Sequence, residues 1–196
     1  MAEMVAEQSA TPTSSQLRKE LERVEHRSTY HRTLRTTIYI LLVVAAVAVL
    51  VATLWLPVLQ VSGSSMEPTL DTGQIVVATK NADFAPGDVV AFYYGNKVLL
   101  KRVIGVAGDT IDIKDDGTVY VNGIALDEPY LSEKSLGQCD IDLPYQVPDG
   151  RIFVMGDNRS VSVDSRTSTV GCITADSIVG KVTFRVWPLN GFGGIS

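Results

Sequence analysis

The sequence predicts a mainly β protein in which a single N-terminal transmembrane helix precedes a β-rich domain that carries an inserted β lobe. Three observations predict this arrangement. The run from Ile38 to Leu59 contains no charged residue, and about 20 apolar residues are enough to span a bilayer. Beyond Gln60, short β-branched runs alternate with turn residues, and no helical pattern longer than a turn or two is present. The 196 residues fit one ordinary domain and an appendage.

Residues 1–35 are predicted to form a basic cytoplasmic leader. Within it, the segment 16–26 places apolar residues at helical spacing among alternating charges, which predicts a helix. A solvated helix next to the membrane is one interpretation. A helix that binds a partner or lies on the membrane surface is the other, and no chemistry is assigned to it.

Residues 36–59 are predicted to be a transmembrane signal anchor. Six Lys and Arg residues precede the apolar run, and none follows it until Lys80. This asymmetry keeps the N-terminal side cytoplasmic, so the domain 60–196 is predicted to lie outside. A cleaved signal peptide is the competing interpretation, but its apolar core would be only about 7 to 15 residues long. The length of the run therefore favours a permanent anchor, and Pro57 is suited to end the helix.

The outer domain is predicted to be one β unit with an inserted lobe. Asp116-Gly117 and Asn122-Gly123 can supply the positive φ angles of tight hairpins, so Thr110–Leu126 is predicted to be a β-meander. The predicted strands are Ile75–Thr79, Val89–Tyr94, Leu99–Val106, Thr110–Lys114, Val119–Val121, Arg151–Met155 and Ile178–Val186.

Charge and cysteine content exclude some functions and leave others open. From residue 60 onward, acidic residues outnumber basic ones by 17 to 11, so there is no basic face for nucleic acid. Cys139 and Cys172 both lie in the outer domain, where a disulfide is permitted, and two separate thiols are the alternative. A zinc site is disfavoured because His26 and His31, the only histidines, both precede the anchor.

The outer domain contains no histidine, so a Ser-His-Asp or Cys-His mechanism is excluded there. Three segments contain groups that could act together without one. The segment 61–70 contains Ser-Met-Glu-Pro-Thr, the apolar run 98–106 contains Lys101, and the segment 155–166 is rich in hydrogen-bonding groups. Taken singly, each has an ordinary explanation: a loop leaving the lipid, a lysine that reaches solvent, and a solvated loop.

In this order after one anchor, the three segments resemble the bacterial type I signal peptidases, the Ser/Lys membrane proteases of the leader peptidase family. The resemblance extends from the anchor to Trp187 and includes the segments 86–90, 121–123 and 128–131. It implies a serine endopeptidase that needs no cofactor or metal.

The resemblance also implies roles for particular residues. The family's nucleophile falls on Ser65, its general base on Lys101, and the serine that hydrogen-bonds the lysine on Ser162. Supporting charged residues fall on Arg102, Asp157, Asp164 and Arg166.

Gly63, Ser64 and Met66 are expected near the substrate or the oxyanion. Some members have a serine at the position of Gly63, whose hydroxyl helps to bind the oxyanion, so the second oxyanion donor is unassigned here. Val161 stands where many members have asparagine, and we have no physical account of that difference.

The expected partners are the lipid bilayer and secretory preproteins with small residues at the first and third positions before the cut. The expected location is the outer face of the bacterial cytoplasmic membrane, in a single-pass protein. One alternative is a specialised relative with one or a few substrates. Another is an inactive peptide-binding protein, which the intact Ser65 and Lys101 disfavour.

Apolar residues follow the last predicted strand in an otherwise acidic domain. Trp187, Leu189 and Phe192 could dip into lipid, or they could form a packed C-terminal edge. The sequence leaves both readings open.

Overall fold

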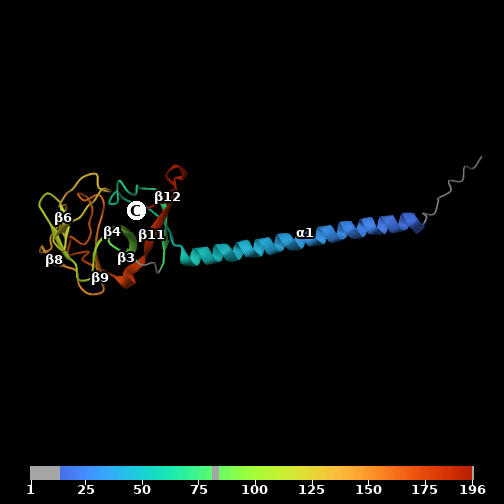
Figure 1. The fold of residues 1–196 in the computed structure, drawn as a ribbon, viewed down its shortest axis with the longest axis horizontal. Helices are drawn as coiled ribbons and strands as arrows, with labels where there is room; N and C mark the ends of the chain where they lie inside the picture. Colours follow the sequence, from blue (N-terminus) through green and yellow to red (C-terminus); the bar gives the residue numbers. More distant parts are fainter. Residues whose placement is uncertain (1–13, 81–83, 196) are drawn as a thin grey trace, which may run out of the picture. The chain divides into compact units, whose positions relative to one another are not determined.

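The computed structural model describes residues 14–80 and 84–195, and the chain divides between Val51 and Ala52 into two compact units. The first unit contains most of α1 (Ser14–Trp55), a single continuous helix whose last residues, 52–55, fall in the second unit (Figure 1). Its part from Arg32 to Val51 is long and apolar enough to cross a membrane, and none of it is buried. A helix with the length and composition of a membrane anchor is therefore present where the sequence predicts one.

The helix ends just before Pro57, the residue expected to end it. α1 stops at Trp55, and Val58 and Leu59, the last apolar residues of the predicted segment 36–59, belong to a strand. Pro57 has no backbone N–H to continue the helix. Of the predicted leader, residues 1–13 lie outside the described residues, and 14–35 belong to α1.

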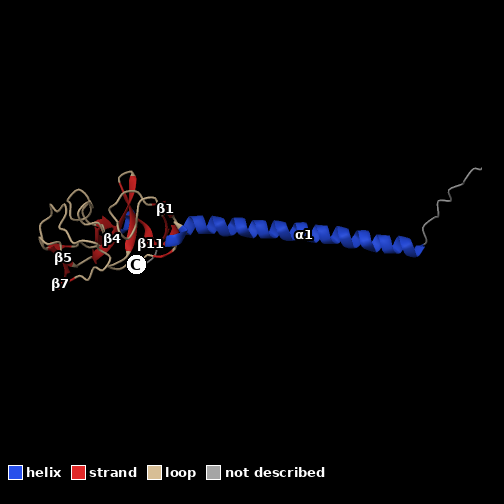
Figure 2. Cartoon of the chain, turned by 90° about the horizontal axis from the view of Figure 1, so that it is seen from above, coloured by secondary structure: helices blue, strands red, loops and turns tan. Residues whose placement is uncertain are grey.

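The second unit confirms the prediction of a β-rich domain with an inserted lobe. Its strands form two antiparallel sheets (Figure 2). The larger sheet has the order β1-β2-β11-β3-β4-β9-β10, with β12 paired to β11. It comprises β1 (Val58–Gln60), β2 (Ile75–Thr79), β3 (Val89–Tyr94), β4 (Lys97–Val106), β9 (Arg151–Met155), β10 (Ile173–Thr174), β11 (Ile178–Trp187) and β12 (Gly193–Gly194).

The smaller sheet is the inserted lobe, and its strands lie in the sequence between β4 and β9. It contains β5 (Thr110–Ile113), β6 (Val119–Val121), β7 (Ile124–Ala125) and β8 (Tyr145–Gln146), in the order β7-β6-β5-β8. Asn122 and Gly123 have φ angles of 54° and 80°, as the two-residue turn between β6 and β7 requires. The predicted meander is therefore present.

Most predicted strand boundaries agree with the structure, and the strands that were not predicted are very short. β1, β8, β10 and β12 contain only two or three residues. An alternating pattern needs at least about four residues to be recognisable. The two three-residue 3₁₀ turns, Ala175–Ser177 and Leu189–Gly191, agree with the expectation of no long helix in this domain.

β4 contacts all three parts of the hydrophobic core. Ile104 belongs to the cluster next to the lobe, Val103 to the cluster under β9, and Leu100 packs against the cluster that contains Met66 and Leu70. Apolar burial on both faces holds this strand in place. A polar side chain carried by β4 therefore has a rigid support.

The apolar residues at the C-terminal end are exposed. Trp187, Leu189 and Phe192 have exposed fractions of 52%, 72% and 62%, and Phe184 is also exposed. The Phe184 and Phe192 rings lie 6.1 Å apart, between centroids. We call Phe184, Trp187, Leu189 and Phe192 the C-terminal apolar patch. The structure thus contradicts the packed-edge alternative.

Candidate active site

A turn between β1 and β2 presents Ser65. Val61, Met66 and Leu70 are buried beneath this turn, and the Val61 N–H donates to the Gln74 carbonyl at 2.8 Å. Gly63 has a φ of +91°, which glycine adopts without strain. Packing below the turn leaves Ser65 half-buried at the surface of the domain.

Lys101 reaches Ser65 from β4. Its side chain is almost completely buried, and Lys101 Nζ donates a 2.6 Å hydrogen bond to Ser65 Oγ. Burial lowers the pKa of Lys101 from 10.5 to about 8. The carboxylates of Asp164 and Asp157 oppose this shift, whereas the Arg166 guanidinium adds to it. A buried amine with a lowered pKa next to a serine hydroxyl is the pairing that a Ser/Lys dyad requires.

Arg102 and Asp157 form a buried ion pair behind the dyad. Arg102 donates from Nε and Nη2 to the two carboxylate oxygens of Asp157, at 2.9 and 2.8 Å. Asp157 also accepts from Thr69 Oγ1 at 2.5 Å, and Arg102 Nη1 donates to the Gly87 carbonyl at 2.6 Å. These bonds connect β4, the nucleophile turn and the loop after β9.

Asp164 and Arg166 hold that loop internally. Asp164 accepts from Arg166 Nε at 2.8 Å, from Arg166 Nη2 at 2.9 Å and from the Gly156 N–H at 2.9 Å. Arg166 also donates to the Leu136 carbonyl at 2.6 Å. The two residues predicted to support the loop therefore lie in its buried interior.

Ser162 differs from the prediction. We expected its hydroxyl to hydrogen-bond Lys101, but Ser162 Oγ is buried and has no hydrogen-bond partner among the described residues. The loop still lies against the nucleophile, because the Asn158 N–H donates to the Ser65 carbonyl at 3.1 Å. The loop that carries Ser162 thus contacts the nucleophile turn, although the Ser162 hydroxyl makes no hydrogen bond to Lys101.

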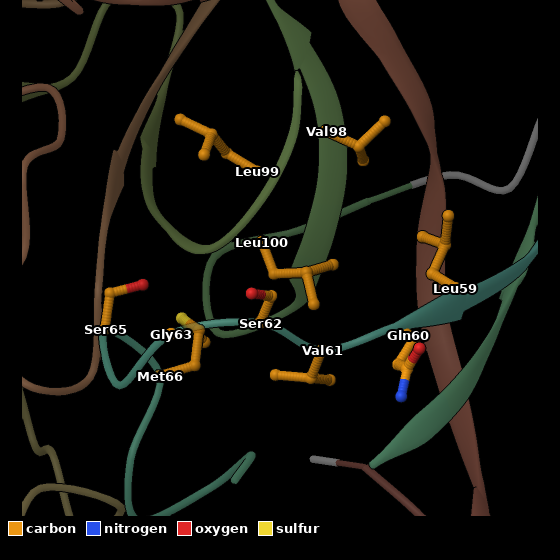
Figure 3. Close-up of a pocket in the computed structure, with 10 residues that line it drawn as sticks. All are labelled: Leu59, Gln60, Val61, Ser62, Gly63, Ser65, Met66, Val98, Leu99 and Leu100. Carbon is orange, nitrogen blue, oxygen red and sulfur yellow. The ribbon is translucent and has the colours of Figure 1, made fainter. Parts of the chain in front are cut away.

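A pocket of about 90 Å³ lies next to Ser65 (Figure 3). Of the three residues expected near the substrate, Gly63 and Met66 line this pocket, whereas Ser64 does not. β9 pairs with β4 only from Arg102 onward, so the pocket side of β4 before that residue has no neighbouring strand among the described residues. The lining residues are Leu59, Gln60, Val61, Ser62, Gly63, Ser65, Met66, Val98, Leu99 and Leu100.

The sequence did not identify another buried ion pair, between Glu128 and Arg159. Arg159 Nη2 donates to Glu128 Oε1 at 2.5 Å, and both side chains are fully buried. Tyr130 lies beside this pair, with its ring 3.9 Å from Arg102 Cζ. Glu128 and Tyr130 were noted only as part of the resemblance. Charged residues in loops are usually solvated, so no feature of the sequence predicts the burial of this pair.

The two cysteines are free thiols in the structure, which corrects the disulfide alternative. Cys172 packs in the core next to the lobe, where burial raises its pKa, whereas Cys139 is half-buried. Among the side chains that the structure describes, no group of three or more from His, Cys, Asp or Glu is placed to hold a metal ion.

Several known proteins are similar to this chain in sequence. Residues 34–187 match the family model described as signal peptidase, peptidase S26. Signal peptidase IB of Staphylococcus aureus is 42% identical over 152 residues, which cover 67% of this chain and 78% of the relative. Signal peptidase I of Bacillus licheniformis is 40% identical over 143 residues, with coverages of 66% and 76%.

Among solved structures, a signal peptidase I from Enterococcus faecalis matches with 31% identity and a TM-score of 0.46. The match covers 52% of this chain and 98% of that one. Because the family model spans most of the chain, and because S. aureus signal peptidase IB shares 42% identity over two thirds of it, the protein belongs to the S26 family of signal peptidases, which are serine proteases.

Proposed function

We propose that this signal peptidase cleaves preproteins with Ser65 as the nucleophile and Lys101 as the general base. The 2.6 Å contact between Ser65 Oγ and the buried Lys101 Nζ carries the proposal. With no histidine after residue 31, Lys101 is the base that the geometry offers.

The lowered pKa makes a lysine base practical. At the ordinary pKa, roughly one lysine in 2,500 is neutral at pH 7. With a pKa of about 8, roughly one in ten is neutral at that pH. A substrate lying over the amine would exclude water and lower its pKa further.

Catalysis then takes two proton transfers in each half-reaction. Neutral Lys101 takes the Ser65 hydroxyl proton as Oγ attacks the scissile carbonyl, and the resulting ammonium gives that proton to the departing amine. The acyl-enzyme is hydrolysed when Lys101 takes a proton from water and returns it to Ser65 Oγ. We assign the first oxyanion donor to the backbone N–H of Ser65. The second donor is unassigned, because Gly63 has no hydroxyl to contribute.

The pocket suits small side chains in the substrate. Its volume of about 90 Å³ is well below that of an ordinary ligand site. An extended peptide can lie between residues 61–63 and the unpaired edge of β4, with alternate side chains directed into the pocket. These features support signal peptides with small residues at the first and third positions before the cut as substrates.

The distribution of charges and the apolar helix support a proposal for the domain organisation. We infer that residues 1–35 are cytoplasmic, that the membrane is crossed by the apolar part of α1, and that the catalytic domain 60–196 lies outside. Protease added to intact cells should digest the domain after Gln60 and spare the region before Arg35. Digestion of the leader from outside would refute this orientation.

The activity itself is tested with purified full-length protein in detergent and a model preprotein. We expect a single cut after a small residue, identified by N-terminal sequencing of the mature product. Ser65→Ala protein is the control for a contaminating protease. Wild-type protein that is folded but leaves the preprotein intact would contradict the proposal.

A further inference from the structure

A short segment of the inserted lobe, residues 128–130, touches both halves of the active site. It follows β7, and a turn closed by the Leu131 N–H and the Glu128 carbonyl (3.2 Å) shapes it. The Glu128 side chain reaches the loop after β9, whereas the Tyr130 ring reaches β4. Each contact is made to an arginine.

The Glu128 contact leads to the nucleophile. Arg159, which Glu128 binds, donates from Nε to the Gly156 carbonyl at 3.0 Å. The N–H of the same Gly156 donates to Asp164, so this residue is held at both its backbone groups. A Cβ at Gly156 would lie 2.5 Å from the Ser65 carbonyl oxygen, which shows how closely the loop backs the nucleophile.

The Tyr130 contact leads to the base. Its ring covers the Arg102 guanidinium at 3.9 Å, within the range of a cation–π interaction. Arg102 directly follows Lys101 on β4 and binds Asp157, whose carboxylate acts on the pKa of Lys101. Ring and guanidinium thus pack together one residue away from the base.

One hydrogen bond joins the two contacts. Tyr130 Oη donates to Glu128 Oε1 at 3.1 Å, and this oxygen also accepts from Arg159. Burial and the neighbouring carboxylate both raise the pKa of Tyr130, so the phenol stays protonated and keeps donating. The carboxylate and the ring are therefore fixed relative to each other.

We propose that Glu128 and Tyr130 are positioning residues, which together fix the loop behind Ser65 and the strand that carries Lys101. The proposal rests on the Ser/Lys function above. Buried ion pairs contribute little net stability compared with apolar side chains of similar volume. The Glu128–Arg159 pair is therefore better explained by the geometry it imposes on the dyad than by stability.

The test measures kcat and KM of full-length protein in detergent on a model preprotein. Neither side chain lines the substrate pocket. Tyr130→Leu and Glu128→Gln should therefore lower kcat at least about 10-fold, because small misplacements of reacting groups slow the chemical step, and leave KM within about twofold. Tyr130→Phe keeps the ring over Arg102 and should recover kcat to within about threefold of wild type.

Matched controls come from the same lobe. Tyr120→Leu removes a half-buried ring whose centroid lies 5.7 Å from Nζ of the exposed Lys114, and Glu133→Gln removes an exposed carboxylate. Both should keep wild-type kcat. An equal loss of kcat in Tyr120→Leu and Tyr130→Leu would show that the lobe needs its aromatic residues only for folding, and would overturn the proposal.

A paired apolar replacement separates positioning from stability. Glu128→Leu combined with Arg159→Met removes both charges and leaves no unpaired buried ion, so the melting temperature should stay close to that of wild type. The kcat should nevertheless stay low, because Arg159 no longer holds the Gly156 carbonyl. Wild-type kcat in this stable double variant would overturn the proposal even if Glu128→Gln failed to fold.

Ser65→Ala and Lys101→Met measured in the same assay keep the two proposals distinguishable. If these variants are active, the Ser/Lys function fails. If they are inactive while Tyr130→Leu and Glu128→Gln are folded and keep wild-type kcat, only the positioning role fails.

Discussion

Lys101 Nζ and Ser65 Oγ lie 2.6 Å apart although 36 positions separate the two residues in the sequence. In this contact the lysine nitrogen is the donor, whereas the proposed mechanism requires the neutral amine to accept the serine proton. The contact therefore exists in two protonation states, and pH selects between them. The first prediction follows from this selection.

The cleavage rate should rise with pH through an apparent pKa of about 8. Burial lowers the pKa of Lys101 to this value, and only the fraction with a neutral amine can take the Ser65 proton. At pH 6 the rate should fall to about one hundredth of its plateau, since each unit below the pKa reduces the neutral fraction tenfold. Initial rates on a fixed preprotein between pH 5.5 and 10 measure the profile. A flat profile over this range would exclude Lys101 as the base.

Removing either member of the dyad should abolish processing. Ser65→Ala removes the attacking oxygen and Lys101→Met removes the base, and the double variant should be scarcely worse than either, because the two groups act as a unit. Lys101→Arg should fail as well, since a guanidinium stays charged at every relevant pH. Single-turnover assays on folded protein, checked by circular dichroism, decide the matter. Near wild-type cleavage by Lys101→Arg would mean that another group is the base.

Lys101→Met should stabilise the fold at neutral pH. The folded state binds the lysine proton more weakly than the unfolded chain does, so the ammonium destabilises the fold below pH 8, and this penalty disappears as the pH rises from 8 to 10.5. Loss of the bond to Ser65 offsets part of the gain, which leaves about 1 to 3 kcal/mol at pH 7.

Urea unfolding of residues 58–196 at pH 7 and pH 10 measures the effect of Lys101→Met. Lys97→Met, at an exposed position of the same strand, is the matched control and should change stability little. A destabilised Lys101→Met variant at pH 7 would show that the buried ammonium is well compensated by Asp164 and Asp157.

Ser162→Ala should leave measurable but slower turnover, about 10- to 1,000-fold down if the hydroxyl assists the general base in the substrate complex. Its hydroxyl has no partner in the free enzyme, so stability should change little and could rise. Kinetics and thermal unfolding together test this. Unchanged kcat would show that Ser162 plays no part in orienting the amine.

Charged replacements in the C-terminal apolar patch should weaken binding to lipid. Leu189→Glu and Phe192→Glu alter side chains that are 72% and 62% exposed, so the fold should be unaffected. Co-sedimentation of residues 58–196 with anionic liposomes measures the effect. Ile124→Glu, at an exposed apolar residue of the lobe, is the control and should bind like wild type. If Leu189→Glu and Phe192→Glu bound liposomes as strongly as Ile124→Glu does, the C-terminal apolar patch would not be a lipid-binding surface.

The sequence predicted the elements that have a local signal. The β6–β7 turn follows from Asn122-Gly123, because few residue pairs adopt two positive φ angles. The long strands follow from β-branched runs, and the anchor follows from the absence of charge. Ser65 and Lys101 came from the resemblance rather than from any pattern of burial.

Other features depend on contacts between segments that are distant in the sequence, so the local sequence pattern does not predict them. Leu59 lies in an apolar run that continues from the anchor, yet it pairs with Val76 as part of β1. Arg159 looks like any arginine in a charged loop, and only the three-dimensional fold places it against Glu128. The missing partner of Ser162 likewise depends on ångström-scale packing, which the residue types alone do not determine.

The strand order of the larger sheet makes the approach of Ser65 and Lys101 depend on a strand that follows both of them in the sequence. Ser65 lies between β1 and β2, Lys101 lies on β4, and β11 pairs with both β2 and β3. Pairing across such sequence separations forms late, because the loop must close first. Until β11 has paired, the sheet lacks the contact that joins the strand after Ser65 to the strand before Lys101, so we expect the proposed dyad to form only late in folding.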